Sequence, residues 1–251
     1  MRLHLPMLDA DPDSPFPDPR GALREPDGLL AFGGDLAPTR LLNAYRQGIF
    51  PWYSPGQPIL WWSPDPRTVF ASDGVHVSRR FARTLRTLDW TITADTAFDR
   101  VVAACADSPR RGQAGTWITP EMRGAYATLH QLGHAHAIEA WDGDALVGGL
   151  YGVAIGQMFF AESMFSAQSG GSKVALMALA AILCQWRWPL FDAQVESPHL
   201  LRMGASTISR AQFLQRIAVQ TALPAPPGSW TTDIGPRDLR WLLGALGIAT
   251  L

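Results

Sequence analysis

The sequence predicts an α+β protein, with a small N-terminal domain followed by a larger domain built on a mixed β-sheet. Its 251 residues are 47% hydrophobic and 17% charged, a globular composition in a chain long enough to bury a substantial core. Up to about residue 65 the chain is rich in prolines, which interrupt long helices and central strands. Beyond residue 134 the patterns follow the order strand, strand, strand, helix, strand, which is typical of a mixed sheet with helices packed on it.

The small domain is expected over residues 1–65, with its boundary where regular patterns begin. Its clearest helix should cover 40–47, capped by Asp35 or Thr39 and ended by Gly48. The aromatic, proline-rich stretch that follows predicts loops and short strands only.

The larger domain is expected over residues 66–223, where regular elements follow one another closely. A turn at 142–144 (DGD) should join two strands into a hairpin, and 172–186 are apolar nearly all round, as in a buried helix. The expected strands cover 68–71, 91–93, 134–141, 145–154, 156–164 and 190–195. The expected helices cover 78–88, 96–106 (capped by Asp95), 120–132 (after Thr119), 172–186 and 209–220. Residues 224–251 should form a proline-rich linker and an apolar tail that docks as a short helix.

Composition excludes several classes of protein. The 21 Lys and Arg against 22 Asp and Glu give a net charge of -1, so any contact with nucleic acid must use a local patch. Two cysteines cannot build a disulfide framework or a thiolate zinc site. His130, His134 and His136 would not share a face, because Gly133 ends the helix between them. This spacing argues against a metal site. The sequence shows neither a secretory leader nor an apolar run long enough to span a membrane, so we expect a soluble, cytoplasmic protein.

Asp192 and Gln194 lie in an otherwise apolar strand segment. Residues i and i+2 of a strand point to the same face, so the carboxylate and the amide should stand side by side. Burying an unpartnered amide-like group costs roughly 2–7 kcal/mol, so both groups need partners. They form either a satisfied structural pair at a strand end, which spacing alone favours, or a pair that orients a nucleophile or accepts its proton.

Glu162 ends an aromatic strand segment. By the same alternation, Met158, Phe160, Glu162 and Met164 should share one face. A lone carboxylate among apolar groups should have a raised pKa unless a cation or hydrogen-bond donors meet it, and it could bind an ammonium or guanidinium group. The alternative is a strand-end residue that turns back to solvent.

Two basic segments are candidates for phosphate binding. Ser172 and Lys173 open the apolar helix after two glycines, which suits a phosphate, although an ordinary capped helix start explains them equally well. The predicted helix over 78–88 carries a face of arginines with no acidic residue among them, and such a single-sign face favours a polyanion over simple solvation. The arginines are Arg79, Arg80, Arg83 and Arg86, and Arg110 and Arg111 would extend this set.

Aromatic residues gather in the first half of the chain. Such sets are usually core, but several of these lie in a loop-like stretch, where stacking on a base or ligand competes with that interpretation. The set comprises Tyr45, Trp52, Trp61, Trp62, Trp117 and Tyr126.

Taken together, the motifs resemble the bacterial leucyl/phenylalanyl-tRNA–protein transferases. The matching blocks follow the family's order from about residue 15 to 215, and they are specific as a set rather than singly. They are 25–36 (EPDGLLAFGGDL), 44–52 (AYRQGIFPW), 61–67 (WWSPDPR), 115–119 (GTWIT), 146–152 (LVGGLYG), 162–166 (ESMFS) and 172–173 (SK). The chain departs from the family at 170–171, often Asn-Ala, at Ala193, often Cys, and beyond residue 228.

The resemblance implies a C-terminal domain of the acetyltransferase-like (GNAT) superfold and an activity that needs no metal or coenzyme. We expect a monomer. It implies transfer of Leu or Phe, and Met less well, from aminoacyl-tRNA to proteins that begin with Arg or Lys, which marks them for degradation. It implies that Asp192 and Gln194 are a catalytic pair and that Glu162 is a further catalytic acid. The implied aminoacyl pocket and adenosine-stacking residues are Tyr45, Trp52, Trp117, Tyr126, Leu150, Phe159, Met164 and Leu179. The residues expected to bind tRNA are Arg79, Arg80, Arg83, Arg86, Ser172 and Lys173.

The chemistry of such a transfer asks little of a base. An aminoacyl ester is already activated, so the protein must mainly position the attacking amine and stabilise the oxyanion. Gln194 could accept a hydrogen bond from the amine while Asp192 polarises it, or the proton could leave through the tRNA 2′-hydroxyl. Glu162 and Glu196 are the candidate acids for a basic N-terminus.

Two other function classes compete with this interpretation. An acyl-CoA-dependent N-acyltransferase would need a Gln/Arg-x-x-Gly-x-Gly/Ala pyrophosphate loop, which the sequence lacks. A non-catalytic tRNA-binding or degradation adaptor would explain the arginines and tryptophans but would leave Asp192 and Gln194 without a role.

Overall fold

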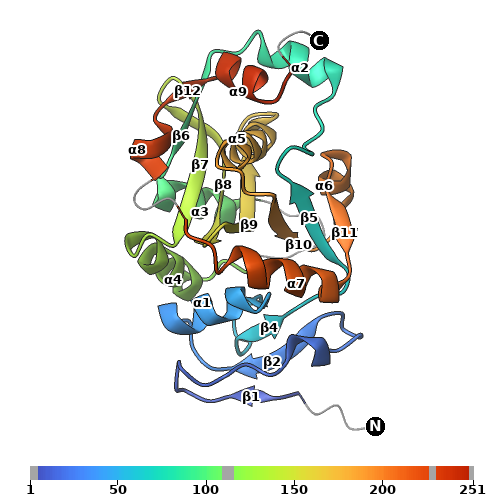
Figure 1. The fold of residues 1–251 in the computed structure, drawn as a ribbon. Helices are drawn as coiled ribbons and strands as arrows, with labels where there is room; N and C mark the ends of the chain where they lie inside the picture. Colours follow the sequence, from blue (N-terminus) through green and yellow to red (C-terminus); the bar gives the residue numbers. More distant parts are fainter. Residues whose placement is uncertain (1–4, 109–115, 226–229, 249–251) are drawn as a thin grey trace.

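The structure, a computed structural model, describes residues 5–108, 116–225 and 230–248, and within them the strands form two sheets (Figure 1). The smaller sheet lies at one end of the molecule, and α2 (Arg79–Leu85) and α9 (Leu239–Ala245) lie at the opposite end. The mixed α+β architecture with a small N-terminal domain is as predicted.

The small sheet has the order β1-β2-β4-β3 and only short strands, as its prolines require. The strands are β1 (Met7–Leu8), β2 (Leu29–Gly33), β3 (Phe50–Pro51) and β4 (Leu60–Trp62), with a 3-10 helix at Pro19–Gly21. The predicted helix is present as α1 (Pro38–Arg46), but neither Asp35 nor Thr39 is its N-cap. Ala37 takes that position because Pro38 occupies the first turn, and Asp35 instead accepts a hydrogen bond from the Ala37 N–H.

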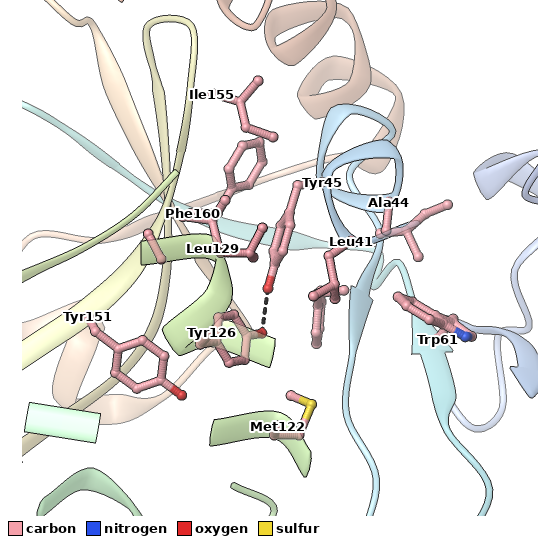
Figure 2. Packing of buried hydrophobic residues seen from close by; sticks show 14 of the residues in the cluster. Leu41, Ala44, Tyr45, Trp61, Met122, Tyr126, Leu129, Tyr151, Ile155 and Phe160 are labelled. Carbon is pink, nitrogen blue, oxygen red and sulfur yellow. Dashed lines mark hydrogen bonds between the residues drawn. The ribbon is translucent and has the colours of Figure 1, made fainter. Parts of the chain in front are cut away.

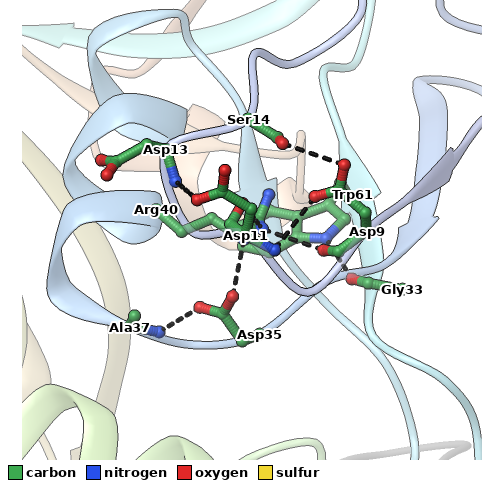
Figure 3. Close-up of polar contacts among 9 residues, drawn as sticks. All are labelled: Asp9, Asp11, Asp13, Ser14, Gly33, Asp35, Ala37, Arg40 and Trp61. Atoms are coloured by element: carbon green, nitrogen blue, oxygen red, sulfur yellow. Dashed lines mark hydrogen bonds and ion pairs between the residues drawn. The ribbon is translucent and has the colours of Figure 1, made fainter.

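Arg40 holds the small domain together from α1 (Figure 3). Its buried guanidinium donates hydrogen bonds to the Asp35 carboxylate and to the backbone carbonyls of Asp9 and Asp11. The N-terminal lead-in is thereby fixed against the helix.

The large sheet has the order β11-β5-β10-β9-β8-β7-β6-β12. Because β10 runs parallel to β9 and antiparallel to β5, the sheet is mixed, as predicted. The predicted hairpin is formed by β7 and β8, with Asp142 opposite Ala145. The strands are β5 (Arg67–Ala71), β6 (Trp90–Ala94), β7 (Ala135–Asp142), β8 (Ala145–Ile155), β9 (Met158–Ser166), β10 (Leu190–Gln194), β11 (Ser206–Ile208) and β12 (Arg237–Asp238).

Two apolar cores lie on the two faces of the large sheet. The α3–α4 core contains residues of α1, α3, α4 and α7, and the α5 core contains residues of α2, α5, α8 and α9. Helix α5 lies directly on β8, since a Cβ at Gly148 would come within 2.2 Å of the Gly171 backbone. The remaining helices are α3 (Phe98–Asp107), α4 (Pro120–Gln131), α5 (Gly171–Gln185), α6 (Pro198–Arg202), α7 (Arg210–Gln220) and α8 (Trp230–Ile234).

The helix caps and the tail show where the sequence expectations succeed and fail. Thr119 caps α4 as predicted. Asp95 does not cap α3, whose N-cap is Ala97, because the Asp95 carboxylate bonds the Ala137 N–H and His136 on β7. The described part of the tail does more than dock a helix: β12 pairs with β6, and Trp230 is buried in the α5 core.

Candidate active site

A cavity of about 390 Å³ lies where the small domain meets β9 and β10. Its lining comes from 50–52 in the small domain, 162–164 on β9, 193–197 at the end of β10, and Trp117. It therefore brings together Trp52, Trp117, Glu162, Met164 and Gln194, which come from four separate segments of the chain. The volume is typical of a site for a small organic group.

Glu162 reaches this cavity because it is the extra residue of a bulge in β9. Ser163 pairs with Tyr151 and Ala161 with Gly152, so Glu162 has no partner on β8. A bulge re-aims a side chain and reverses the alternation beyond it. The expectation that Met158, Phe160, Glu162 and Met164 share one face is consequently wrong: Met158 and Phe160 lie in the α3–α4 core, and Met164 packs against the α5 core.

Two buried tyrosines hold the Glu162 carboxylate. Tyr45 Oη lies 2.7 Å from Oε1 and Tyr126 Oη lies 2.9 Å from Oε2, while the two hydroxyl oxygens are 2.6 Å apart. Figure 2 shows how Tyr45 on α1 and Tyr126 on α4 meet inside the α3–α4 core. Burial, and after it the charge of Glu162, raises the pKa of both phenols well above the usual value, so both remain protonated donors.

This triangle of two hydroxyls and one carboxyl group favours a protonated Glu162. Its three contacts need three protons, and the two hydroxyls supply two, so the third is present only when the carboxyl is neutral. Burial raises the pKa of Glu162 to about 7, although hydrogen bonds from Tyr45, Tyr126 and Gln194 favour the ionised form. The pKa is therefore raised even though hydrogen-bond donors meet the carboxyl, the case for which the sequence predicted no rise, and near neutral pH the group holds its proton only loosely.

Gln194 is oriented by Glu162. Its side-chain Nε2 donates a hydrogen bond to Glu162 Oε1 at 2.6 Å. Because the amide nitrogen is engaged there, the amide oxygen is the group left to accept a hydrogen bond from a ligand in the cavity. Gln194 has a φ of 59°, in the left-handed region that is uncommon for residues other than glycine.

Asp192 lies outside the cavity lining, fully buried behind Gln194. Both of its oxygens accept hydrogen bonds from Arg67, at 2.8 and 2.6 Å, and Oδ1 also accepts the backbone N–H of Gln194 at 2.9 Å. The two side chains are therefore not side by side, as strand alternation suggested, because the pairing of β10 with β5 is irregular between Asp192 and Gln194. Arg67 was missed as a site residue, although a charge opening the apolar run of β5 signals a need for a partner.

The aromatic residues divide into cavity walls and supports. Trp52 and Trp117 line the cavity, and Trp62 lies behind Trp52 with 5.7 Å between ring centroids and its Nε1 donating to the Trp52 carbonyl. Trp61 is core, with its Nε1 donating to the Gly33 carbonyl.

Five residues of the implied pocket do not line the cavity: Tyr45 and Tyr126, which lie behind Glu162, and three further apolar residues. Leu150, Phe159 and Leu179 are buried in the α5 core, against which Met164 packs, and none of them lines the cavity. Met164 is thus the member of this apolar group that a ligand would touch.

The basic residues lie near one another at the α2 end of the molecule. Arg79, Arg80 and Arg83 are exposed on α2. The helix ends at Leu85, so Arg86 is its C-cap and donates a hydrogen bond to the Ile248 carbonyl of the tail. Arg110 and Arg111 lie outside the described residues.

The start of α5 contacts both the end of β9 and α2. The Ser172 N–H donates to Ser166 Oγ at 2.8 Å, and the Lys173 ammonium lies 5.2 Å from the ring centroid of Phe81 on α2. Lys173 therefore sits beside the arginine-bearing helix.

No group of three or more His, Cys, Asp or Glu able to hold a metal ion occurs in the part of the chain that the structure describes. His136 contacts Asp95 at 2.7 Å and stacks on Trp230. Within the same described residues, no helix is both long and apolar enough to cross a lipid bilayer.

Comparison with known proteins identifies the family. Residues 69–218 match the model of leucyl/phenylalanyl-tRNA protein transferase, and residues 34–65 match the model of its N-terminal domain. The chain belongs to this family. The leucyl/phenylalanyl-tRNA–protein transferase of Xanthomonas campestris pv. campestris (strain 8004) is 65% identical over 238 residues, which cover 95% of this chain and 96% of the relative. That of Xylella fastidiosa (strain M23) is 61% identical over 240 residues, which cover 94% and 98%. The resemblance noted from the motifs is confirmed, and the protein is a transferase.

Proposed function

We propose that this transferase moves Leu or Phe, and Met less well, from aminoacyl-tRNA to the α-amine of proteins that begin with Arg or Lys, and so marks them for degradation. The single observation that carries the proposal is the Gln194–Glu162 contact at an aromatic and apolar cavity of about 390 Å³. The relatives' names agree with a donor of this kind.

The donor fits the cavity by chemical type. Trp52 and Trp117 offer faces on which the terminal adenosine can stack, and Met164 offers an apolar wall for the side chain of Leu or Phe. Glu162, with its pKa near neutrality, can ionise to receive the α-ammonium group of the aminoacyl donor. An ammonium ion beside it would favour that ionisation.

The reaction then needs positioning more than base catalysis. The acceptor α-amine has a pKa of about 7.7–8.0, so part of it is neutral at pH 7. The Gln194 amide oxygen accepts a hydrogen bond from the neutral amine and aims its lone pair at the ester carbonyl. The new C–N bond forms as the ester C–O bond to the ribose breaks, and the amine proton passes to the leaving ribose oxygen. Asp192 lies behind Gln194 and is hydrogen-bonded to Arg67, so it is not placed to take this proton. The proton can instead pass through the 2′-hydroxyl of the tRNA ribose.

The acceptor's basic side chain needs an acid near the cavity mouth. Glu196 lines the cavity and is exposed, so it can meet an Arg or Lys side chain without a large desolvation cost. The arginines of α2 with Lys173 and Ser172 form the surface that we assign to the tRNA backbone.

We assign the large domain to the GNAT superfold, supported by the antiparallel β7, β8 and β9 followed by α5 and a β10 that runs parallel to β9. The small sheet ends at Trp62 and the large one begins at Arg67, which supports a boundary between domains over 1–65 and 66–223. The tail at 224–251 adds β12 to the large sheet. We further infer that the protein acts as a cytoplasmic monomer without a coenzyme.

The test is transfer itself. The protein is incubated with Leu-tRNA or Phe-tRNA and with peptides that differ only in a first residue of Arg, Lys, Asp or acetylated Arg, and products are read by mass spectrometry. We expect one added Leu or Phe on the Arg and Lys peptides alone. Transfer from acetyl-CoA instead would favour the N-acyltransferase alternative, and tRNA binding without transfer would favour the adaptor.

A further inference from the structure

Arg67 is a buried arginine at the start of β5 with every guanidinium nitrogen engaged. Nε and Nη2 donate to the two oxygens of Asp192 at 2.8 and 2.6 Å, and Nη1 donates to the Gly48 carbonyl at 3.0 Å. The rings of Phe50 and Phe213 lie 4.9 and 4.5 Å from the guanidinium carbon. Such a planar, two-point fork fixes direction as well as distance, which a lysine cannot do.

The partners of Arg67 belong to the two chain segments that meet at Glu162 Oε1. Asp192 accepts the backbone N–H of Gln194, the residue whose amide bonds Oε1. Gly48 follows α1, which carries Tyr45, the other donor to Oε1. One guanidinium therefore ties the end of β10 to the end of α1, directly behind the groups that orient Glu162.

Gln194 needs such a tie. Its positive φ is uncommon for a residue with a side chain, and it persists only where the surroundings hold it. The Asp192 carboxylate supplies that hold, since it is fully buried and receives Gln194 N–H and Arg67 together.

We propose that Arg67 is a positioning residue for aminoacyl transfer, and that Asp192 acts as its partner in fixing Gln194 rather than as a group that touches the substrate. This inference rests on the proposed function. A displacement of about 1 Å in a positioned group can cost on the order of 100-fold in rate.

The test compares two buried arginines that each pair with an aspartate. In the full chain, Arg67→Lys keeps the charge but loses the fork, and we expect kcat for Leu transfer to an Arg peptide to fall about 100-fold, with KM for Leu-tRNA nearly unchanged. Arg40→Lys is the matched control (Figure 3), because Arg40 is equally buried and pairs with Asp35, but its partners Asp35, Asp9 and Asp11 lie in the small domain away from the cavity lining. We expect Arg40→Lys to lower the melting temperature and to leave kcat per folded molecule as in the parent.

A paired replacement guards against misfolding. Arg67→Met combined with Asp192→Leu removes both charges at once, so no unpaired charge remains buried and the protein is expected to fold. We expect the same loss of kcat in this paired variant. Adding Asp192→Leu to Arg67→Met should therefore cause no further loss of kcat.

Normal kcat in a folded Arg67→Lys or in the paired variant would overturn the inference. So would a loss of kcat confined to Asp192→Leu, because Asp192 would then act on the substrate without Arg67. Absence of transfer by the parent protein would instead refute the proposed function.

Discussion

Replacing Glu162 by glutamine should change the pH dependence of both the free energy of unfolding and kcat/KM for Leu-tRNA. Glu162 and Glu139 each have a pKa raised by burial from 4.5 to about 7. Between those values the folded protein keeps the proton and the unfolded chain releases it, so the free energy of unfolding falls as pH rises. At about 1.4 kcal/mol per pKa unit, each carboxyl accounts for roughly 3 kcal/mol between pH 4.5 and 7.

Glu139 is the matched control for this experiment. It is fully buried on β7, where Thr93 Oγ1 donates to Oε2 at 2.6 Å and the Ala97 N–H donates to Oε1 at 3.1 Å, and it does not line the cavity. Glu162→Gln and Glu139→Gln should each remove about half of the combined fall in stability. The measurement is urea unfolding of the parent and both variants at several pH values from 5 to 8.

The pH dependence of kcat/KM for Leu-tRNA distinguishes the Glu162 carboxyl from the Glu139 carboxyl. The parent and Glu139→Gln should show kcat/KM for Leu-tRNA rising with pH through about 7, as Glu162 ionises to receive an ammonium group. Glu162→Gln should lose that rise, at an acceptor concentration that saturates the parent. If Glu162→Gln kept the parent's profiles of both stability and kcat/KM, the triangle of Glu162, Tyr45 and Tyr126 would not be the site that holds the titrating proton.

Four further outcomes follow from the same geometry. Gln194→Ala should lower kcat about 100-fold with little change in donor affinity, read in single-turnover transfer; a change in KM alone would contradict its role. Met164→Ala should weaken binding of Leu and Phe donors by about 1–3 kcal/mol and that of an Ala donor less, and unchanged discrimination would remove Met164 from the pocket. Replacing Arg79 and Arg83 by Gln should reduce the salt slope of tRNA affinity by about 0.7–0.9 per lost phosphate contact, with the melting temperature barely moved. Arg86→Gln should also lower thermal stability, since it loses the bond to the Ile248 carbonyl; equal melting temperatures for the two sets would refute that distinction.

Elements with a strong local pattern could be predicted from the sequence. The apolar run of α5, the Gly143 turn between β7 and β8, and the Thr119 cap of α4 each depend on neighbours within a few residues. Short strands such as β2 and β11 were missed, because their pairing partners, not their own residues, make them strands.

The site was predicted by residue type but not by geometry. Asp192, Gln194, Glu162 and the tryptophans could be named because polar groups in apolar strands and tryptophans in loops need an explanation. Arg67 and Asp192 are 125 positions apart, and no periodicity in a single sequence connects them. The tyrosines looked like pocket walls, and only the fold shows that they hold Glu162 from behind.

Both failures of the alternation rule fall at residues that contact each other. A regular β9 would keep Glu162 within the ladder with β8, and a regular β10 would place Gln194 in register beside Asp192. The bulge in β9 instead leaves Glu162 without a partner on β8. The bulge in β10 leaves Ala193 unpaired and turns Gln194, which still pairs with Thr68, away from Asp192. The side chains of Glu162 and Gln194 then meet at 2.6 Å in the cavity. Bulges break pairing, so they persist only where other bonds compensate, and here the compensating groups are Tyr45 and Tyr126 for Glu162 and the Asp192–Arg67 pair for Gln194. The residues that support the site therefore differ from the residues that touch the substrate. Strand alternation, which assigns every second residue to one face, fails at this site because both of the strands that carry it are bulged there.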